Sequence, residues 1–256
     1  MSTIKDKIYF TYNNISSRDF GLMHVETGSG MYEELFVADR SIIETTNRTG
    51  KPLFNRLEEK PITFTLNLAF EGKFDVYLID DVINWLFQDY YKPLYFEGKE
   101  DKLYYCMAEG SSSIIHNGLN EGYITLTMRC DSSRLYSDER LTDPIIYDGL
   151  NSETIEILNI GHDEVPVKIS IDKVGNGDVI ISNDGKNFSI TGLMNGESIF
   201  IDSGREIIET DLLNTYRYDN VVGDFENLTL KRGKNNITIS GGACTVQIKH
   251  VHRYKF

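Results

Sequence analysis

Apolar and polar positions alternate over much of the chain, which is the pattern of β-strands that bury one face. The clearest stretch is 61–70, where apolar side chains recur at every second position from Ile62 to Phe70. Aromatic and β-branched residues at 8–12 predict an earlier strand, and a loop tip is expected at 27–30. Further strands of the first half are expected at 22–25, within the longer alternating segment 33–47, and at 94–96, 103–108, 111–116 and 122–130.

Residues 79–90 break this alternation and predict a helix. Asp80 and Asp81 would lie in its first turn, where the helix dipole favours carboxylates, and Pro93 would end it. Trp85, the only tryptophan, lies inside the segment. The spacing therefore predicts a helix that covers the core of a sheet. Its apolar residues are spaced as on one helical face: Ile79, Val82, Ile83, Leu86, Phe87 and Tyr90.

The second half shows no helical period and many short strands. Asn-Gly and Asp-Gly turns separate the strands, which is typical of a β-sandwich or jelly roll. A polar stretch at 131–143 precedes this half, and we place a linker at 135–143. The pattern predicts a mainly β protein with two domains, 1–138 with one α-helix and 139–256 as a β-sandwich. Strands of the second half are expected at 154–158, 167–171, 179–182, 187–190, 198–202, 206–209, 228–231, 236–240 and 245–251.

The composition narrows the function classes. The 26 basic and 39 acidic residues give a formal net charge of −13, which opposes tight binding to nucleic acid because phosphates require cationic partners. No apolar run approaches the roughly 20 residues that span a bilayer, and the first residues lack an apolar signal segment. We therefore expect synthesis in a cytoplasm and no membrane partner. Cys106, Cys130 and Cys244 are odd in number and far apart, so buried free thiols are expected.

Acidic clusters and histidines are the candidate reactive groups, and neither predicts an active site. Adjacent carboxylates would diverge to opposite faces of a strand, and this applies to Glu33-Glu34, Glu58-Glu59 and Asp80-Asp81. His250 and His252 would share one strand face, but the spacing supplies no third metal ligand. His116 and the turn at 162–164 could join them only through the fold, and histidines at a sheet edge or on the surface are the commoner case.

The remaining motifs have structural explanations. The run 172–178 has the acidic and glycine residues of a calcium loop but lacks the trailing glutamate of an EF-hand, and a hairpin turn explains it. No nucleophile elbow or phosphate-binding glycine loop is present. We expect no enzyme, no catalytic residue, no metal and no cofactor, and the sequence leaves the partner-binding residues unknown.

An ordered set of motifs in the first half resembles the siphophage distal tail protein family. The run FTYNNISSRDFGL at 10–22 is similar to the opening of that family, with Asn14 where glycine is usual. The runs INWL at 83–86, YKPLYF at 91–96 and LYYCM at 103–107 resemble its helix and following strands. GYITLTMRC at 122–130 resembles its closing strand, and SRLY at 133–136 replaces its usual ending.

The second half is similar to the galectin-like C-terminal domain of the same family. The resemblance rests on TIEILNIG at 154–161, GDVIISN at 177–183, GESIFID at 196–202 and RGKNNITISG at 232–241. It implies a virion protein of the tail tip, a homo-hexameric ring that joins the tail tube to the tail-associated hub protein. DNA would pass through the ring without specific binding, and the tape measure and receptor-binding proteins are further partners that the resemblance suggests. Short turns leave no room for the receptor-binding arm of some relatives.

The sequence leaves open an alternative function and the location of the ring contacts. Galectin-like folds often bind sugars, so a carbohydrate-binding module for host adhesion is the alternative, although the second half has no tryptophan to stack on a sugar. If the chain forms a ring, each subunit needs two different contact surfaces. We expect one of them in the long segment 26–60, which is poorly explained as part of a compact sandwich.

Overall fold

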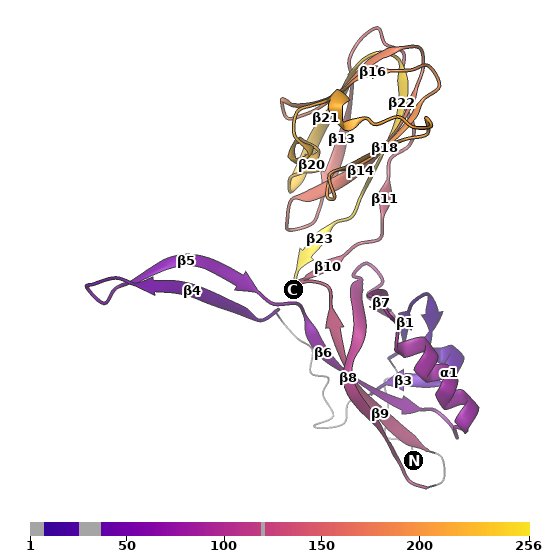
Figure 1. Cartoon of the computed structure of the whole chain (residues 1–256). Coiled ribbons are helices and arrows are strands. Elements are labelled where there is room, and N and C mark those ends of the chain that lie inside the picture. The colour runs from indigo at the N-terminus through magenta and orange to yellow at the C-terminus, as the bar shows by residue number, and fades with distance from the viewer. Residues whose placement is uncertain (1–7, 26–36, 119–120) are drawn as a thin grey trace. The chain divides into compact units, whose positions relative to one another are not determined.

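The computed structural model describes residues 8–25, 37–118 and 121–256 (Figure 1). It divides into two compact units, which we describe separately. Unit 1 comprises residues 1–136 and 254–256, and unit 2 comprises residues 137–253. The loop tip expected at 27–30, the pair Glu33-Glu34 and the start of the segment 33–47 lie outside the described residues.

A seven-stranded antiparallel sheet forms the body of unit 1, with the strand order β2-β1-β7-β8-β9-β6-β3. A bridge between Ile8 and His24 brings the β3 edge back to the chain that enters β1, so the sheet curls upon itself. The core lies inside this curl, where Phe10, Leu66 and Leu126 are fully buried. The strands are β1 (Phe10–Tyr12), β2 (Ile15–Ser16), β3 (Leu22–His24), β6 (Thr63–Phe70), β7 (Lys92–Phe96), β8 (Tyr104–His116) and β9 (Gly122–Cys130).

Smaller elements complete unit 1. A 3-10 turn, η1 (Ser17–Phe20), links β2 to β3. β10 (Arg134–Tyr136) pairs with the last strand, β23 (Arg253–Lys255). Leu135 is buried in the core of unit 1, so the linker expected from residue 135 begins inside the unit. The remaining strands, β4 (Arg40–Thr46) and β5 (Pro52–Glu59), form a separate hairpin.

The predicted helix is present as α1 (Val76–Leu86), but its expected limits of 79 and 90 were wrong. Asp75 is the N-cap, because its carboxylate accepts a hydrogen bond of 2.8 Å from the Leu78 N–H and satisfies a free backbone donor. Asp80 and Asp81 therefore lie beyond the first turn. The helix ends at Leu86, well before Pro93.

The buried face of α1 is centred on Trp85. Its indole Nε1–H donates to the Tyr12 carbonyl at 2.8 Å, and the ring stacks on Phe20 with centroids 4.6 Å apart. An indole buries more surface than any aliphatic side chain and needs a partner for its N–H. The position of Trp85 therefore determines which face of α1 is buried. Val82 and Leu86 are buried beside it, whereas Ile83 and Phe87, predicted on the same face, are exposed.

Unit 2 is a sandwich of two antiparallel sheets, as the turn chemistry predicted. One sheet has the order β11-β22-β14-β17-β18, with β12 on β22 and β20 on β14; the other has the order β13-β21-β15-β16-β19. Both contribute to one apolar core, for example Ile169 and Val246 from the first and Ile181 and Ile239 from the second. The strands are β11 (Arg140–Leu141), β12 (Ile145–Tyr147), β13 (Glu153–Asn159), β14 (Val165–Lys173), β15 (Gly177–Asn183), β16 (Lys186–Leu193), β17 (Ser198–Asp202), β18 (Ile207–Thr210), β19 (Val221–Val222), β20 (Thr229–Leu230), β21 (Gly233–Gly241) and β22 (Cys244–His250). Two 3-10 turns, η2 (Tyr218–Asn220) and η3 (Phe225–Asn227), complete the unit.

Two-residue turns fix the register of the tight hairpins. Asp184 and Gly185 connect β15 to β16 with φ of 50° and 81°, and Asn13 and Asn14 connect β1 to β2 with φ of 49° and 63°. Such turns require positive φ at both central residues, which Asn, Asp and Gly tolerate best. The asparagine at position 14 is thus compatible with the turn that glycine usually makes. The only α-helix of the described residues has 11 residues, too short to cross a bilayer.

Candidate functional site

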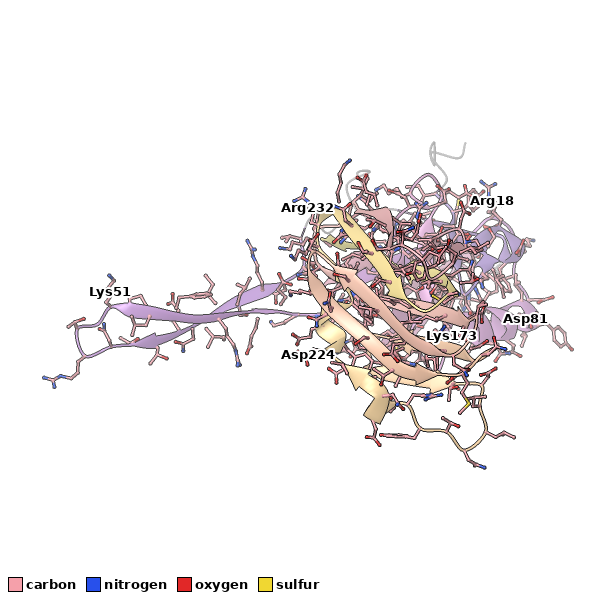
Figure 2. All side chains as sticks on the ribbon, turned by 90° about the horizontal axis from the view of Figure 1, so that it is seen from above. Arg18, Lys51, Asp81, Lys173, Asp224 and Arg232 are labelled. Atoms are coloured by element: carbon pink, nitrogen blue, oxygen red, sulfur yellow. The ribbon has the colours of Figure 1, made fainter. Side chains whose placement is uncertain are left out.

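The hairpin of β4 and β5 stands apart from the sheets of the described residues. Among these residues its two strands pair only with each other, and every residue of β5 is exposed. Figure 1 shows the hairpin extending away from the rest of unit 1, and Figure 2 shows its side chains projecting from both strands, with Lys51 near the tip. An isolated two-stranded hairpin is marginally stable in water, so this element gains most by packing on another surface.

A bulge brings three apolar side chains of the hairpin onto one face. Ile42 lies opposite Leu57, and Glu44 lies opposite Phe54, with a register shift between Ile43 and Glu44. Because positions 42 and 44 share a face, the shift places Phe54 on the side of Leu57; a regular ladder would place it on the other. The side chains of this apolar hairpin face are exposed by 63% at Ile42, 65% at Phe54 and 41% at Leu57.

The base of the hairpin is fixed to unit 1. The Lys60 amide donates to the Asp39 carbonyl at 2.8 Å, and the Lys60 ammonium lies 2.7 Å from the Asp39 carboxylate. Glu59 forms an ion pair with Arg134, and this hydrogen bond lowers the pKa of Glu59. The hairpin therefore leaves unit 1 in a defined direction, which favours a specific contact with another surface.

The outer face of α1 is a second exposed apolar surface. Val76, Ile83 and Phe87 recur at i, i+7 and i+11, which places them on one side of the helix. Val76 is 71% exposed and Ile83 is 47% exposed. Both views show this helix on the side of unit 1 opposite the hairpin (Figures 1 and 2). Unit 1 thus carries two different apolar surfaces on opposite sides.

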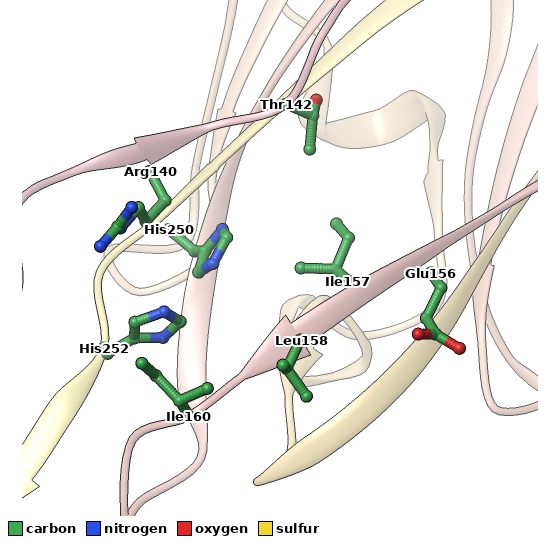
Figure 3. A pocket seen from close by; sticks show the side chains of 8 residues that line it. All are labelled: Arg140, Thr142, Glu156, Ile157, Leu158, Ile160, His250 and His252. Atoms are coloured by element: carbon green, nitrogen blue, oxygen red, sulfur yellow. The ribbon is translucent and has the colours of Figure 1, made fainter.

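A pocket of about 360 Å³ lies in unit 2 between the β22 and β13 regions (Figure 3). His250 and His252 line it together, with ring centroids 5.0 Å apart. Both rings are buried, so the surface location expected for these histidines was wrong. The other lining residues are Arg140, Thr142, Glu156, Ile157, Leu158 and Ile160.

The hydrogen bonds of Asn159 define the tautomer of His252. The Asn159 amide nitrogen donates to the carbonyls of Asp163 and Leu230, both at 3.0 Å, so its oxygen is the acceptor. This oxygen lies 3.1 Å from His252 Nδ1, which must therefore carry the proton. Burial and the nearby Arg140 lower the pKa of His252, so the ring is neutral at pH 7.

His250 is held neutral more strongly. Its Nδ1 is buried without a hydrogen-bond partner. Burial, then His252 and Arg140, lower its pKa to about 4. Arg140 opposes a bound cation, and the described residues contain no group of three or more His, Cys, Asp or Glu side chains placed to hold a metal ion. The pair His250-His252 is therefore part of a buried polar cluster.

This burial makes the stability of unit 2 depend on pH. The folded pKa of His250 (about 4) lies below its unfolded value (6.5), so the unfolded chain binds more protons between these values and stability falls as pH drops from 6.5 to 4. The loss reaches at most about 3 kcal/mol. His250→Gln should flatten the slope in urea titrations between pH 7 and 4, whereas His116→Gln, an exposed change in unit 1, should leave it intact. An unchanged slope in His250→Gln would contradict this.

The other candidate residues lie in separate parts of the described structure. Asp172 accepts from the Ser198 hydroxyl at 2.7 Å, and Asp178 accepts from the Gly192 amide at 2.8 Å. The run 172–178 connects β14 of one sheet to β15 of the other, so the hairpin turn expected there was wrong. Glu58 forms an ion pair with Arg56. Asp80 and Asp81 lie exposed on α1, and His162 also lies on the surface. The three cysteines are buried free thiols, as expected.

One buried charged pair was missed in the sequence. Glu197 and Arg217 form a bidentate pair, with Nε–Oε1 at 2.7 Å and Nη2–Oε2 at 2.6 Å. Their side chains are 0% and 6% exposed. They are 20 positions apart with no pattern between them, and only the fold brings them together. Their many partners indicate a structural role.

Comparisons with known proteins agree with this architecture. Residues 5–132 match a phage tail protein N-terminal domain family, and residues 137–250 match a phage tail C-terminal domain family. The chain is 32% identical to the SPbeta prophage-derived uncharacterized protein YomH of Bacillus subtilis (strain 168), over 98% of this chain and 99% of that protein.

Two solved structures share the fold over nearly the whole chain. The first is the Dit protein (gp 19.1) of phage SPP1, described as a paradigm of the hub adsorption apparatus in phages that infect Gram-positive bacteria. It has a TM-score of 0.69 and 15% identity, covering 95% of this chain and 98% of that one. The second belongs to the phage p2 baseplate in its activated conformation with Ca, with a TM-score of 0.55 and 8% identity, covering 96% and 97%.

Proposed function

The chain belongs to this family of phage tail proteins and has the fold of a siphophage distal tail protein; from that premise we propose that it closes into a hexameric ring at the tail tip. The ring joins the tail tube to the tail-associated hub protein. The observation that carries this proposal is the pair of apolar surfaces on opposite sides of unit 1, the hairpin face and the outer face of α1.

A closed ring requires head-to-tail contacts, in which one surface of each copy meets a different surface of the next. The apolar hairpin face supplies one surface, because Ile42, Phe54 and Leu57 are exposed together on it and are stabilised by leaving water. The outer face of α1, with Val76 and Ile83, supplies the other. We propose that the hairpin of each copy packs against α1 of its neighbour. The unpaired hairpin is thereby stabilised by assembly.

The charge of the chain is compatible with DNA transit. A formal net charge of −13 per copy repels phosphates, and a channel through which DNA slides must bind it weakly. The DNA would therefore pass through the ring without specific binding.

Unit 2 has no long arm, and this limits its role in receptor binding. Every residue of unit 2 is described. The longest connection between its strands and 3-10 turns is the one from β18 to η2, which covers only residues 211–217. Leu213 and Tyr216 are exposed on it. A receptor-binding protein, if attached here, would contact the sandwich itself. The tape measure protein remains a further partner that the family suggests.

The adaptor function is tested by reconstitution with the tail tube and hub proteins of the same phage. The expected result is a ternary complex in sedimentation velocity, with the chain between its two partners in negative-stain images. A chain that binds neither protein, alone or with the other present, would overturn the proposal. Specific retention of the chain on a glycan array without these partners would support the sugar-binding alternative.

A further inference from the structure

Two of the three cysteines face each other across the central strands of unit 1. Cys106 on β8 and Cys130 on β9 are paired residues in the antiparallel register. Both are completely buried in the same core. Burial raises the pKa of the Cys106 thiol, and its hydrogen bond with the Cys130 thiol raises it further. The two residues thus lie opposite each other on the buried face of the sheet.

The backbone hydrogen bonds show which type of pair this is. The Cys130 amide donates to the Ile62 carbonyl at 2.8 Å, away from β8. The next residue, Asp131, donates to the Tyr105 carbonyl at 2.9 Å. Hydrogen-bonded and non-hydrogen-bonded pairs alternate along an antiparallel ladder, so Cys106 and Cys130 form a non-hydrogen-bonded pair. In such pairs the Cα atoms are about 4.5 Å apart and the side chains are closest.

This geometry meets the requirements of a disulfide. Disulfides occur at Cα separations of roughly 4.4–6.8 Å, and both side chains point to the same face of the sheet. We propose that Cys106 and Cys130 are an oxidation site that forms a disulfide between β8 and β9. The bond would connect two neighbouring central strands of the seven-stranded sheet. Cys244 has no such partner among the described cysteines, because the other two belong to unit 1.

The oxidant that we name is a low-molecular-weight disulfide such as oxidised glutathione. One protein thiolate attacks it, forming a mixed disulfide and releasing one glutathione thiolate. The second protein thiolate then attacks the mixed disulfide, forms the bond between Cys106 and Cys130, and releases the second glutathione. The two cysteines lose two electrons and two protons, and one glutathione disulfide becomes two glutathione thiols. Because both thiols are buried, β8 or β9 must open locally for the exchange.

When this oxidation would occur rests on the proposed function. The ability of Cys106 and Cys130 to form the disulfide rests only on their pairing in the sheet. A reducing cytoplasm keeps thiols free during synthesis. A tail protein released by lysis enters an oxidising medium, where the same pair would cross-link the sheet that supports the hairpin and α1. The disulfide would therefore stabilise the assembled particle after its release.

The test uses the full chain, folded in buffers with different ratios of reduced to oxidised glutathione, then quenched and mapped by mass spectrometry. A disulfide typically stabilises a fold by about 2–4 kcal/mol. By linkage, folding favours formation of the disulfide, relative to its formation in the unfolded chain, by the same free energy. We thus expect the Cys106–Cys130 link to form about 30- to 1,000-fold more readily in the native chain than in concentrated guanidinium chloride. Cys244 should stay free and react with an alkylating reagent after unfolding.

Equal link formation in the native and denatured chains, or links that involve Cys244 instead, would overturn the proposal. Cys130→Ala is the matched control, in which no intramolecular Cys106 link should appear. The readout does not depend on oligomeric state or on any tail partner. A failure here would leave the ring proposal intact, and a monomeric chain would leave this proposal intact.

Discussion

Serine substitutions at Ile42, Phe54 and Leu57 should convert the assembled chain into folded monomers. Fully burying an apolar side chain of this size contributes about 1.5–3 kcal/mol, and the three lie on one face of the hairpin. Because only their exposed fractions remain to be buried, their combined loss would weaken each junction by about 3–5 kcal/mol, which is at least about a hundredfold in affinity. Light scattering after gel filtration measures the mass, and far-UV circular dichroism shows that the fold persists.

The opposite face of the same hairpin offers a matched control. Leu53 pairs with Thr45 and is half exposed, so Leu53→Ser is the control for the single variant Leu57→Ser and removes an apolar side chain from the other side. This variant should keep the assembly. Deleting residues 40–57 is the cruder version of the experiment and should also leave folded monomers. Rings that survive this deletion would exclude the hairpin as a ring contact.

Mixing two defective variants tests the head-to-tail contact itself. Val76→Ser with Ile83→Ser disables the α1 surface and leaves the hairpin intact. Mixed with the hairpin-face variant, it can form one productive junction, from its own hairpin to the other chain's helix. The expected product is a one-to-one heterodimer from two monomeric parents. A mixture that stays monomeric would show that these two surfaces are not partners.

The second large effect is expected at the buried pair of Glu197 and Arg217. Burial raises the pKa of Glu197, but hydrogen bonds from Arg217, the Met194 amide and Thr210 offset it and hold the pKa below its ordinary value. Arg217→Met leaves a buried carboxylate without its counter-charge, which costs about 3–5 kcal/mol. Unit 2 of this variant should unfold at much lower urea concentration.

The location of the tryptophan makes this prediction measurable in the intact chain. Trp85 is the only tryptophan and lies in unit 1, so its fluorescence follows unit 1, while far-UV circular dichroism follows both units. In Arg217→Met the dichroism should show an early transition that the fluorescence lacks. Replacing both partners, with Glu197→Leu added, should recover part of the loss, because no unpaired charge remains. No separation of the two signals would contradict the structural role of the pair.

Features that depend on local chemistry could be predicted from the sequence. Alternation located the strand that is now β6, and the dipeptide Asp184-Gly185 located a hairpin turn, because each is determined by neighbouring residues. The helix limits failed because the apolar spacing does not identify the capping residue. Asp75 caps the helix before the first residue of the predicted apolar face.

Features that depend on register could not be predicted. The face on which Phe54 lies depends on a bulge, and no residue type in this segment predicts that bulge. The burial of His250 needs the alignment of strands far apart in the chain, and the pairing of Cys106 with Cys130 needs the register between the consecutive strands β8 and β9. The segment 26–60 was expected to hold a contact surface because it fits no compact strand. Its residues 40–59 form the hairpin that the ring proposal uses.

The mass of the purified full-length chain tests the central proposal most directly. Light scattering over a wide concentration range, together with negative-stain imaging, should show closed rings of six copies. A hexamer mass with ring-shaped particles is the predicted result. A two-fold dimer at all concentrations would contradict the account, because it would bury identical surfaces and leave no head-to-tail junction between the hairpin and α1.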